Sequence, residues 1–199
     1  MIKKIITILL LVIGNFTQSQ TYTTIEPMEN RGGVEQGVYY KDFNNVLNGY
    51  EGTYEYNGSD FYFKLILDKK VCANYNNYWW IDLLKGTYQY IINGVETNYL
   101  NDSLTTNNIP ARVEIKIIEP SNDPALPYVC SDCLAVKWLR GYISDRVNKK
   151  AASIAIAKKI VNGQEGIHIM FHLEVSSKQP WESNAPIQLP IKSFFMKKL

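Results

Sequence analysis

The chain has 199 residues, of which 46% are hydrophobic and 20% are charged, and its net charge at pH 7 is +2. A chain with this apolar content and so few charges can bury a core, which excludes an intrinsically disordered protein. The near balance of 21 basic and 19 acidic residues provides no electrostatic attraction for nucleic acid or for an anionic membrane surface. The length is typical of one domain.

Residues 1–20 have the pattern of a cleaved export signal. Two lysines precede an apolar run from Ile5 to Ile13, and polar and small residues follow that run. A membrane-spanning helix needs about 20 apolar residues, so the run is too short to span a bilayer. We therefore expect a secreted or periplasmic protein without a membrane span.

The next segment, residues 21–37, is polar and has no hydrophobic period, which predicts a flexible lead-in. A single domain is expected to occupy residues 38–199 and to begin with a short helix at 38–50. Asp42 is a suitable N-cap for this helix because its side chain can accept backbone hydrogen bonds, and Gly49 is a suitable terminator.

Alternating hydrophobic and polar residues dominate the rest of the domain. The clearest run covers residues 167–176, where isoleucine, phenylalanine, leucine and valine occupy every second position. In a strand these side chains lie on one face, because successive side chains point to opposite sides. Asn57-Gly58 and Asn93-Gly94 predict two-residue hairpin turns, since this residue pair tolerates the positive φ of a type I′ turn.

The connections between these runs are too short for the helix that joins parallel strands, which predicts an antiparallel sheet of about eight to ten strands. Such a sheet must protect its edge strands, and closing into an up-and-down β-barrel does so. The expected fold is therefore an all-β antiparallel barrel with a short N-terminal helix. A two-sheet β-sandwich is the alternative, because sandwiches also consist of many short alternating strands.

Residues 40–54 carry Tyr-Lys-Asp, then Asn-x-x-Leu and then Gly-Thr-Tyr, and residues 85–88 carry Lys-Gly-Thr-Tyr. With these motifs the start of the domain resembles a family of short secreted Bacteroidota proteins that is catalogued as a domain of unknown function. The match extends from Tyr39 to Tyr90, and the resemblance implies no catalytic residue. The order of helix, Gly-x-aromatic and hairpin is also similar to the start of lipocalin-like calycin barrels, with Tyr54 in the place of a tryptophan.

The three cysteines predict a disulfide once the chain is exported. Cys130 and Cys133 stand in Cys-Ser-Asp-Cys, and Cys72 lies far upstream, so at least one thiol is left over. A lone Cys-x-x-Cys lacks the four ligands of a structural zinc site. A redox-active pair is expected to open a helix, whereas a strand-like run follows this pair. We expect a bridge either between Cys130 and Cys133 or from Cys72 to one of them.

His168 and His172 are the only histidines. In a strand their separation spans about 13 Å, which is too far to share a metal ion, so no metal site and no cofactor is predicted. Both side chains are expected to face solvent. They would contact a ligand only if their face of the strand lined the barrel interior.

The sequence predicts a protein that is not an enzyme. It contains no Gly-x-Ser-x-Gly elbow and no glycine-rich phosphate loop within an ordered region. Pairs of carboxylates for glycoside hydrolysis could be drawn from four residues, but any β protein offers as many. These residues, which define a less favoured hydrolase alternative, are Asp60, Asp68, Asp82 and Glu96.

An aromatic cluster provides the candidate ligand-binding residues, which are Tyr75, Tyr78, Trp79 and Trp80. Flat rings beside the neighbouring asparagines suit stacking on a sugar or a flat apolar ligand, although aromatic residues are also common in strands. The predicted function is non-enzymatic binding of a small apolar or aromatic-stackable molecule. The alternative is a module with a filled barrel that binds a protein, or has a structural role, in the cell envelope. An empty barrel interior favours the first function, and a filled interior with exposed apolar residues favours the second.

Overall fold

The structure is a computed structural model that describes residues 21–30, 33–100, 113–120, 130, 132–133, 137–145, 150–172 and 187–199. The predicted export signal at 1–20 lies outside these residues. Across the described ranges, no helix has the length and apolar composition needed to cross a membrane.

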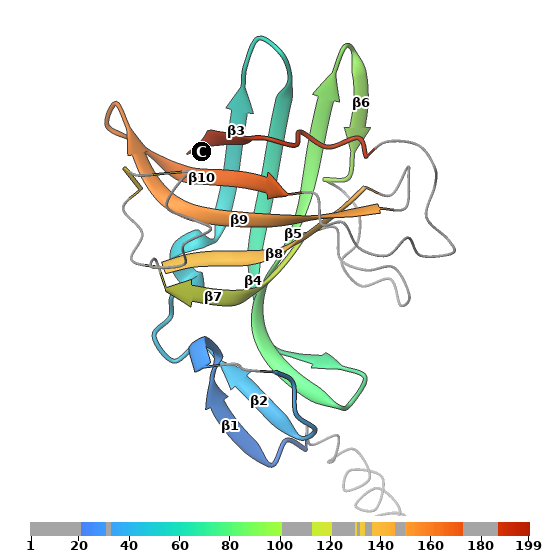
Figure 1. Cartoon of the computed structure of the whole chain (residues 1–199), viewed down its shortest axis with the longest axis vertical. Helices are drawn as coiled ribbons and strands as arrows, with labels where there is room; N and C mark the ends of the chain where they lie inside the picture. The colour runs from blue at the N-terminus through green and yellow to red at the C-terminus, as the bar shows by residue number, and fades with distance from the viewer. Residues whose placement is uncertain are drawn as a thin grey trace, which may run out of the picture.

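The described chain is almost entirely β-structure (Figure 1). Its elements in chain order are β1 (Thr24–Pro27), the 3-10 helix η1 (Met28–Asn30), β2 (Val38–Lys41), the 3-10 helix η2 (Leu47–Tyr50), β3 (Gly52–Asn57), β4 (Tyr62–Tyr75), β5 (Trp79–Ile92), β6 (Val95–Asn98), β7 (Val113–Pro120), β8 (Lys137–Asp145), β9 (Lys150–Val161), β10 (Gln164–His172) and β11 (Ser193–Lys198).

Eight of these strands close an antiparallel β-barrel. Their order around the barrel is β5-β4-β3-β11-β10-β9-β8-β7, and β7 pairs again with β5 (Figure 1). The closing contact pairs Leu84 with Ile115 and Gly86 with Val113. Closure confirms the predicted barrel over the two-sheet sandwich.

Alternate residues of the barrel strands fill its interior. On β4, Phe63 and Leu65 are fully buried, and on β10 Ile167, Ile169 and Phe171 are buried as the alternation predicts. These inward rows belong to one continuous hydrophobic cluster that includes all eight barrel strands. The period-two pattern of the sequence is therefore the pattern of the core.

Aromatic rings bridge the interior from one wall to the other. Phe63 on β4 and Phe171 on β10 lie three places apart around the barrel, yet their ring centroids are 5.6 Å apart. Phe63 also stacks on Tyr88 at 5.5 Å, and Phe171 stacks on Phe194 at 5.8 Å. An eight-stranded barrel is just wide enough for side chains to fill, and these rings occupy its centre.

The short helix predicted at 38–50 is wrong. The segment forms β2, a turn and the single 3-10 turn η2, because Tyr39 and Tyr40 pair with the start of β5. Asp42 nevertheless accepts hydrogen bonds from the backbone nitrogens of Val46 and Leu47, both at 2.9 Å. The N-cap residue of the one-turn helix η2 is Val46, so the N-cap predicted at Asp42 is wrong, although the Asp42 side chain binds the start of η2.

Residues 21–37, which the sequence predicts to be a lead-in, contain β1 and η1. β1 pairs in parallel with β2, and β2 pairs in parallel with β5, so these two pairings outside the barrel depart from the predicted antiparallel arrangement. Met28 of η1 is buried in the main core. The sequence does not predict β1, because the four residues of this strand have no hydrophobic alternation.

The hairpin turns agree in part with the Asn-Gly signals. Asn93 and Gly94 have φ values of 50° and 77°, as a type I′ turn requires, and they connect β5 to β6. Asn57-Gly58 instead opens a longer connection, in which the Gly58 nitrogen donates to the Phe61 carbonyl at 3.1 Å. The two-residue turn predicted at Asn57 is therefore wrong.

Candidate functional site

A small sheet projects from one end of the barrel and carries the aromatic residues that the sequence singles out. We call it the tip sheet; it consists of β1, β2 and the ends of β4 and β5 on either side of their turn (Figure 1). A register shift between Lys70 and Ala73 marks the bulge beyond which β4 continues into this sheet. The tip sheet is the candidate functional site.

The asparagines of the tip build its turn. Asn76 and Asn77 both have positive φ, at 56° and 57°, a conformation that asparagine tolerates better than most residues. The Asn74 carboxamide accepts from the Asn77 backbone nitrogen at 2.7 Å and donates to the Asn77 side chain at 2.6 Å. Both amides are thus engaged inside the turn.

Tyr75 and Trp79 stack on each other on one face of the tip sheet. Their ring centroids are 4.2 Å apart and their planes differ by 11°. The Lys116 ammonium of β7 lies 5.1 Å from the Tyr75 ring centroid, and the Tyr75 hydroxyl donates to the Glu114 carboxylate. This stack fixes the tip sheet to the barrel, and one face of each ring is already covered by the other ring.

Trp80 lies on the opposite face, because adjacent residues of a strand point in opposite directions. It is buried against Tyr22, whose ring centroid is 5.9 Å away, and Tyr22 also contacts Tyr39 at 5.0 Å. The Trp80 indole nitrogen has no hydrogen-bond acceptor among the described residues. Tyr78, in the turn, is 47% exposed.

The structure therefore divides the four predicted residues between two faces and the turn. Tyr75 and Trp79 share one face, Trp80 occupies the other, and Tyr78 alone is strongly exposed. Sequence reasoning missed Tyr22 and Tyr39, which complete the Trp80 side. Tyr39 falls in the stretch that was expected to be helical, and Tyr22 falls in the expected lead-in.

A buried carboxyl group links the strands at the base of the tip sheet. Asp82 accepts hydrogen bonds from the Tyr39 hydroxyl at 2.6 Å, the Cys72 backbone nitrogen at 2.9 Å and the Asp42 backbone nitrogen at 3.1 Å. Burial, and then the hydrogen bond to Asp82, raises the pKa of Tyr39, and burial with nearby Asp82 raises the pKa of the Cys72 thiol. A phenol and a thiol with raised pKa values stay protonated, so neither is an activated nucleophile.

Three of the four carboxylates named for hydrolysis have separate partners, and the fourth, Asp68, is exposed on β4. Asp82 is enclosed by its three donors, the exposed Asp60 pairs with Lys192, and Glu96 accepts from Gln89. Each of these three acids has its own local partner, which is the arrangement of structural and surface carboxylates.

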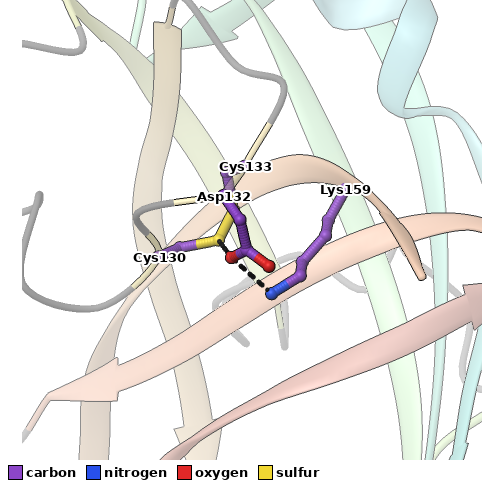
Figure 2. Close-up of a disulfide and its surroundings, with 4 residues drawn as sticks. All are labelled: Cys130, Asp132, Cys133 and Lys159. Carbon is purple, nitrogen blue, oxygen red and sulfur yellow. Dashed lines mark hydrogen bonds and ion pairs between the residues drawn. A yellow bond between two sulfur atoms is a disulfide. The ribbon is translucent and has the colours of Figure 1, made fainter.

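The disulfide lies on the outer wall of the barrel. Cys130 and Cys133 are bonded with their Cα atoms 5.4 Å apart, and Cys72 is not part of a bridge. Figure 2 shows Lys159 reaching from β9 toward Asp132, which lies between the two cysteines, at 2.7 Å. The bridge packs on a second hydrophobic cluster outside the barrel, formed by Trp138, Ala155, Ala157 and Met170.

His168 belongs to this outer layer, and its predicted exposure is wrong. Only 7% of the residue is exposed, and its ring lies edge-on to Trp138 at 6.4 Å. Burial, and then the charge of Lys159, lowers the pKa of His168 against an opposite effect of Asp132. The side chain of His172 lies outside the described residues. Those that are described include no group of three or more side chains able to hold a metal ion.

The free energy of unfolding is expected to depend on pH through His168. Because its folded pKa lies below the ordinary 6.5, the unfolded chain binds more protons below that pH. Stability should therefore fall as the pH drops below that value, by up to about 1.4 kcal/mol per pH unit. Urea denaturation at several pH values between 7.5 and 5 measures this loss. His168→Phe should show a shallower pH dependence, and an unchanged dependence would contradict the assignment.

Comparison of the sequence with curated proteins and with solved structures found no match. The sequence pattern of one family matches residues 1–198, which is nearly the whole chain. The two regions that carry the tip sheet and the disulfide both lie inside the match. The chain therefore belongs to the family of unknown function DUF6705.

Proposed function

We propose that this protein is an exported, non-enzymatic interaction module that binds a partner protein through the outside of its tip sheet. The observation that supports this most strongly is the contact between Phe63 and Phe171 across the barrel, at 5.6 Å. A barrel whose centre is occupied by its own rings favours external over internal binding. This reverses the order of the two functions expected from the sequence.

Exposed apolar side chains make the tip sheet a suitable surface for such a contact. Tyr78 is exposed at the turn, Ile25 on β1, Val34 before β2 and Val71 beside the bulge. Apolar and aromatic side chains at an interface supply most of its binding energy, tyrosine and tryptophan above all. The tip sheet also holds these groups on a rigid base, because the Tyr75–Trp79 stack and Asp82 fix its strands.

The partner is proposed to contact the side chains of the tip sheet and not the backbone of its edge strand. β1 is the outermost strand of the tip sheet within the described part, but it has only 4 residues and ends in Pro27. A short edge strand that ends in proline is a common protection against the addition of another strand. The partner is therefore expected to present an apolar patch and not a free strand.

Export forms part of the proposal. The pattern of residues 1–20 supports it, and so does the bridge between Cys130 and Cys133, because disulfides persist mainly outside the cytosol. The partner is then expected among proteins of the cell envelope or the cell surface.

A photo-crosslinking residue at position 78 tests this proposal in the cells that make the protein. The matched control is position 142, since Tyr142 is also exposed, at 39%, but lies on the barrel wall in β8. A discrete protein adduct is expected from position 78 and not from position 142. With that partner purified, Tyr78→Ala should weaken binding about tenfold or more, as truncation of an interface tyrosine does. Equal adducts at both positions, or binding unaffected by Tyr78→Ala, would refute the proposal.

A further inference from the structure

The end of the barrel beside η2 contains a pocket of about 140 Å³. It shares no residue with the tip sheet, and it is lined by Gly49, Tyr54, Lys158, Lys159, Ile160, Glu165, Gly166 and Lys198. Since a water molecule takes up about 30 Å³ of liquid, the pocket has room for a small polyatomic ion. We propose that it binds a small oxyanion, with phosphate as the type, between Lys158 and Lys198.

The two lysines continue inward-facing rows of the barrel. On β9, Ile154 and Ile156 fill the core and Lys158 follows at the next position of the same row. On β11, Met196 is fully buried and Lys198 follows in the same way. The apolar rows of two strands therefore end in ammonium groups at the same mouth of the barrel.

An aromatic ring lies beside each of these two ammonium groups. The Lys158 nitrogen is 5.3 Å from the Tyr50 ring centroid, and the Lys198 nitrogen is 5.9 Å from the Tyr54 ring centroid. In the ranges that the structure describes, neither lysine forms an ion pair. Their cationic charge is thus held in place by ring faces and remains available to an anion.

The lysines next to Lys158 and Lys198 in the sequence, in contrast, do form ion pairs. Lys159 pairs with Asp132 at 2.7 Å, and Lys197 pairs with Glu55 at 3.1 Å. Lys197 points to the other side of its strand, where Glu55 meets it, and Lys159, which also contributes to the pocket lining, is paired with Asp132. Lys158 and Lys198 therefore bring to the pocket two positive charges without an ion-pair partner in the described part of the chain, against the one negative charge of Glu165.

Gly49 leaves the space that the Lys158 ammonium group occupies. A Cβ atom at position 49 would lie 2.1 Å from the Lys158 nitrogen, so a larger residue would displace the lysine head. Glu165 is the acidic residue of the pocket lining, and its charge opposes binding of an anion. Removing that charge is therefore expected to strengthen binding.

Calorimetric titration of the purified protein with inorganic phosphate tests the site, with sodium chloride at matched ionic strength as the blank. Saturable binding of phosphate is expected. Titrations with sulfate and with acetate then show whether the site prefers a tetrahedral oxyanion or binds any oxyanion. Either result supports the site. Lys158→Gln and Lys198→Gln should each weaken binding about fivefold, the loss expected for one exposed charge contact. Glu165→Gln should tighten it.

Lys197→Gln is the matched control, because Lys197 is adjacent to Lys198 but is paired with Glu55 outside the pocket. It should change the affinity by less than about twofold. The proposal is overturned if phosphate shows no saturable binding beyond that of chloride. It is also overturned if Lys197→Gln weakens binding as much as Lys198→Gln does.

Discussion

Replacing Phe63 with alanine is expected to lower the free energy of unfolding by about 3–5 kcal/mol. Phe63 is 0% exposed, and its ring contacts Tyr88 and Phe171 on different walls of the barrel. Alanine would remove those contacts and leave a cavity that the surrounding strands cannot collapse into. Urea denaturation monitored by tryptophan fluorescence measures the loss.

Phe43→Ala is the matched control for this substitution. Phe43 is 52% exposed and lies outside the barrel, so its replacement should change stability by only about 0.5 kcal/mol. Equal losses for the two variants would show that Phe63 does not lie in a packed interior.

Asp82→Ala should destabilise the protein by a similar amount, about 3–5 kcal/mol, because three donors, two of them buried, lose their acceptor together. Those donors are the Tyr39 hydroxyl and the backbone nitrogens of Cys72 and Asp42. They come from β2, from the bulge of β4 and from the turn before η2, so the loss should loosen the whole base of the tip sheet. Thermal unfolding gives the loss, and hydrogen exchange of β2 amides gives its location.

Asp60→Ala is the control for Asp82→Ala, because Asp60 is a surface carboxylate. It pairs with Lys192 while half exposed, and such exposed pairs contribute little to stability because solvent screens them. Asp82→Asn keeps one acceptor oxygen and should lie between the two alanine variants. If Asp82→Ala costs no more than Asp60→Ala, the buried hydrogen bonds do not hold the tip sheet.

The barrel was predictable because several of its strands, β4 and β10 among them, alternate hydrophobic and polar residues. Phe63, Leu65, Ile167 and Ile169 are buried as the pattern requires, and the Asn93-Gly94 turn has the φ values that its residues favour. These features depend on neighbours in the sequence, so a local pattern is enough to find them. The closure of the barrel was predicted from the need to protect edge strands, and this need applies to β-sheets in general.

The N-terminal strands were not predictable in this way. β2 forms because Tyr39 and Tyr40 pair with Trp80 and Ile81, some forty residues later in the chain. The local sequence around Asp42 instead resembles a helix start, and tertiary pairing overrides that preference.

The composition of the sequence located the candidate site, but it did not predict how the side chains of the site are arranged. Trp79 and Trp80 are adjacent, so a strand must point them to opposite faces, and the structure does so. His168 is buried because the Cys130–Cys133 bridge and Trp138 cover the outer face of its strand, which no local pattern reveals. Lys158 and Lys198 line the same pocket only because the register of β9, β10 and β11 brings two inward rows to one end of the barrel.

The filled interior is the claim on which the proposed external binding depends, and titration with small neutral apolar ligands tests it most directly. Benzene and naphthalene are added to the unmodified protein and to Phe63→Ala, and binding is followed by calorimetry. The unmodified protein should show no saturable binding, whereas the variant should bind benzene in the space that the Phe63 ring leaves. Saturable, stoichiometric binding to the unmodified protein would contradict a barrel that is filled by its own side chains.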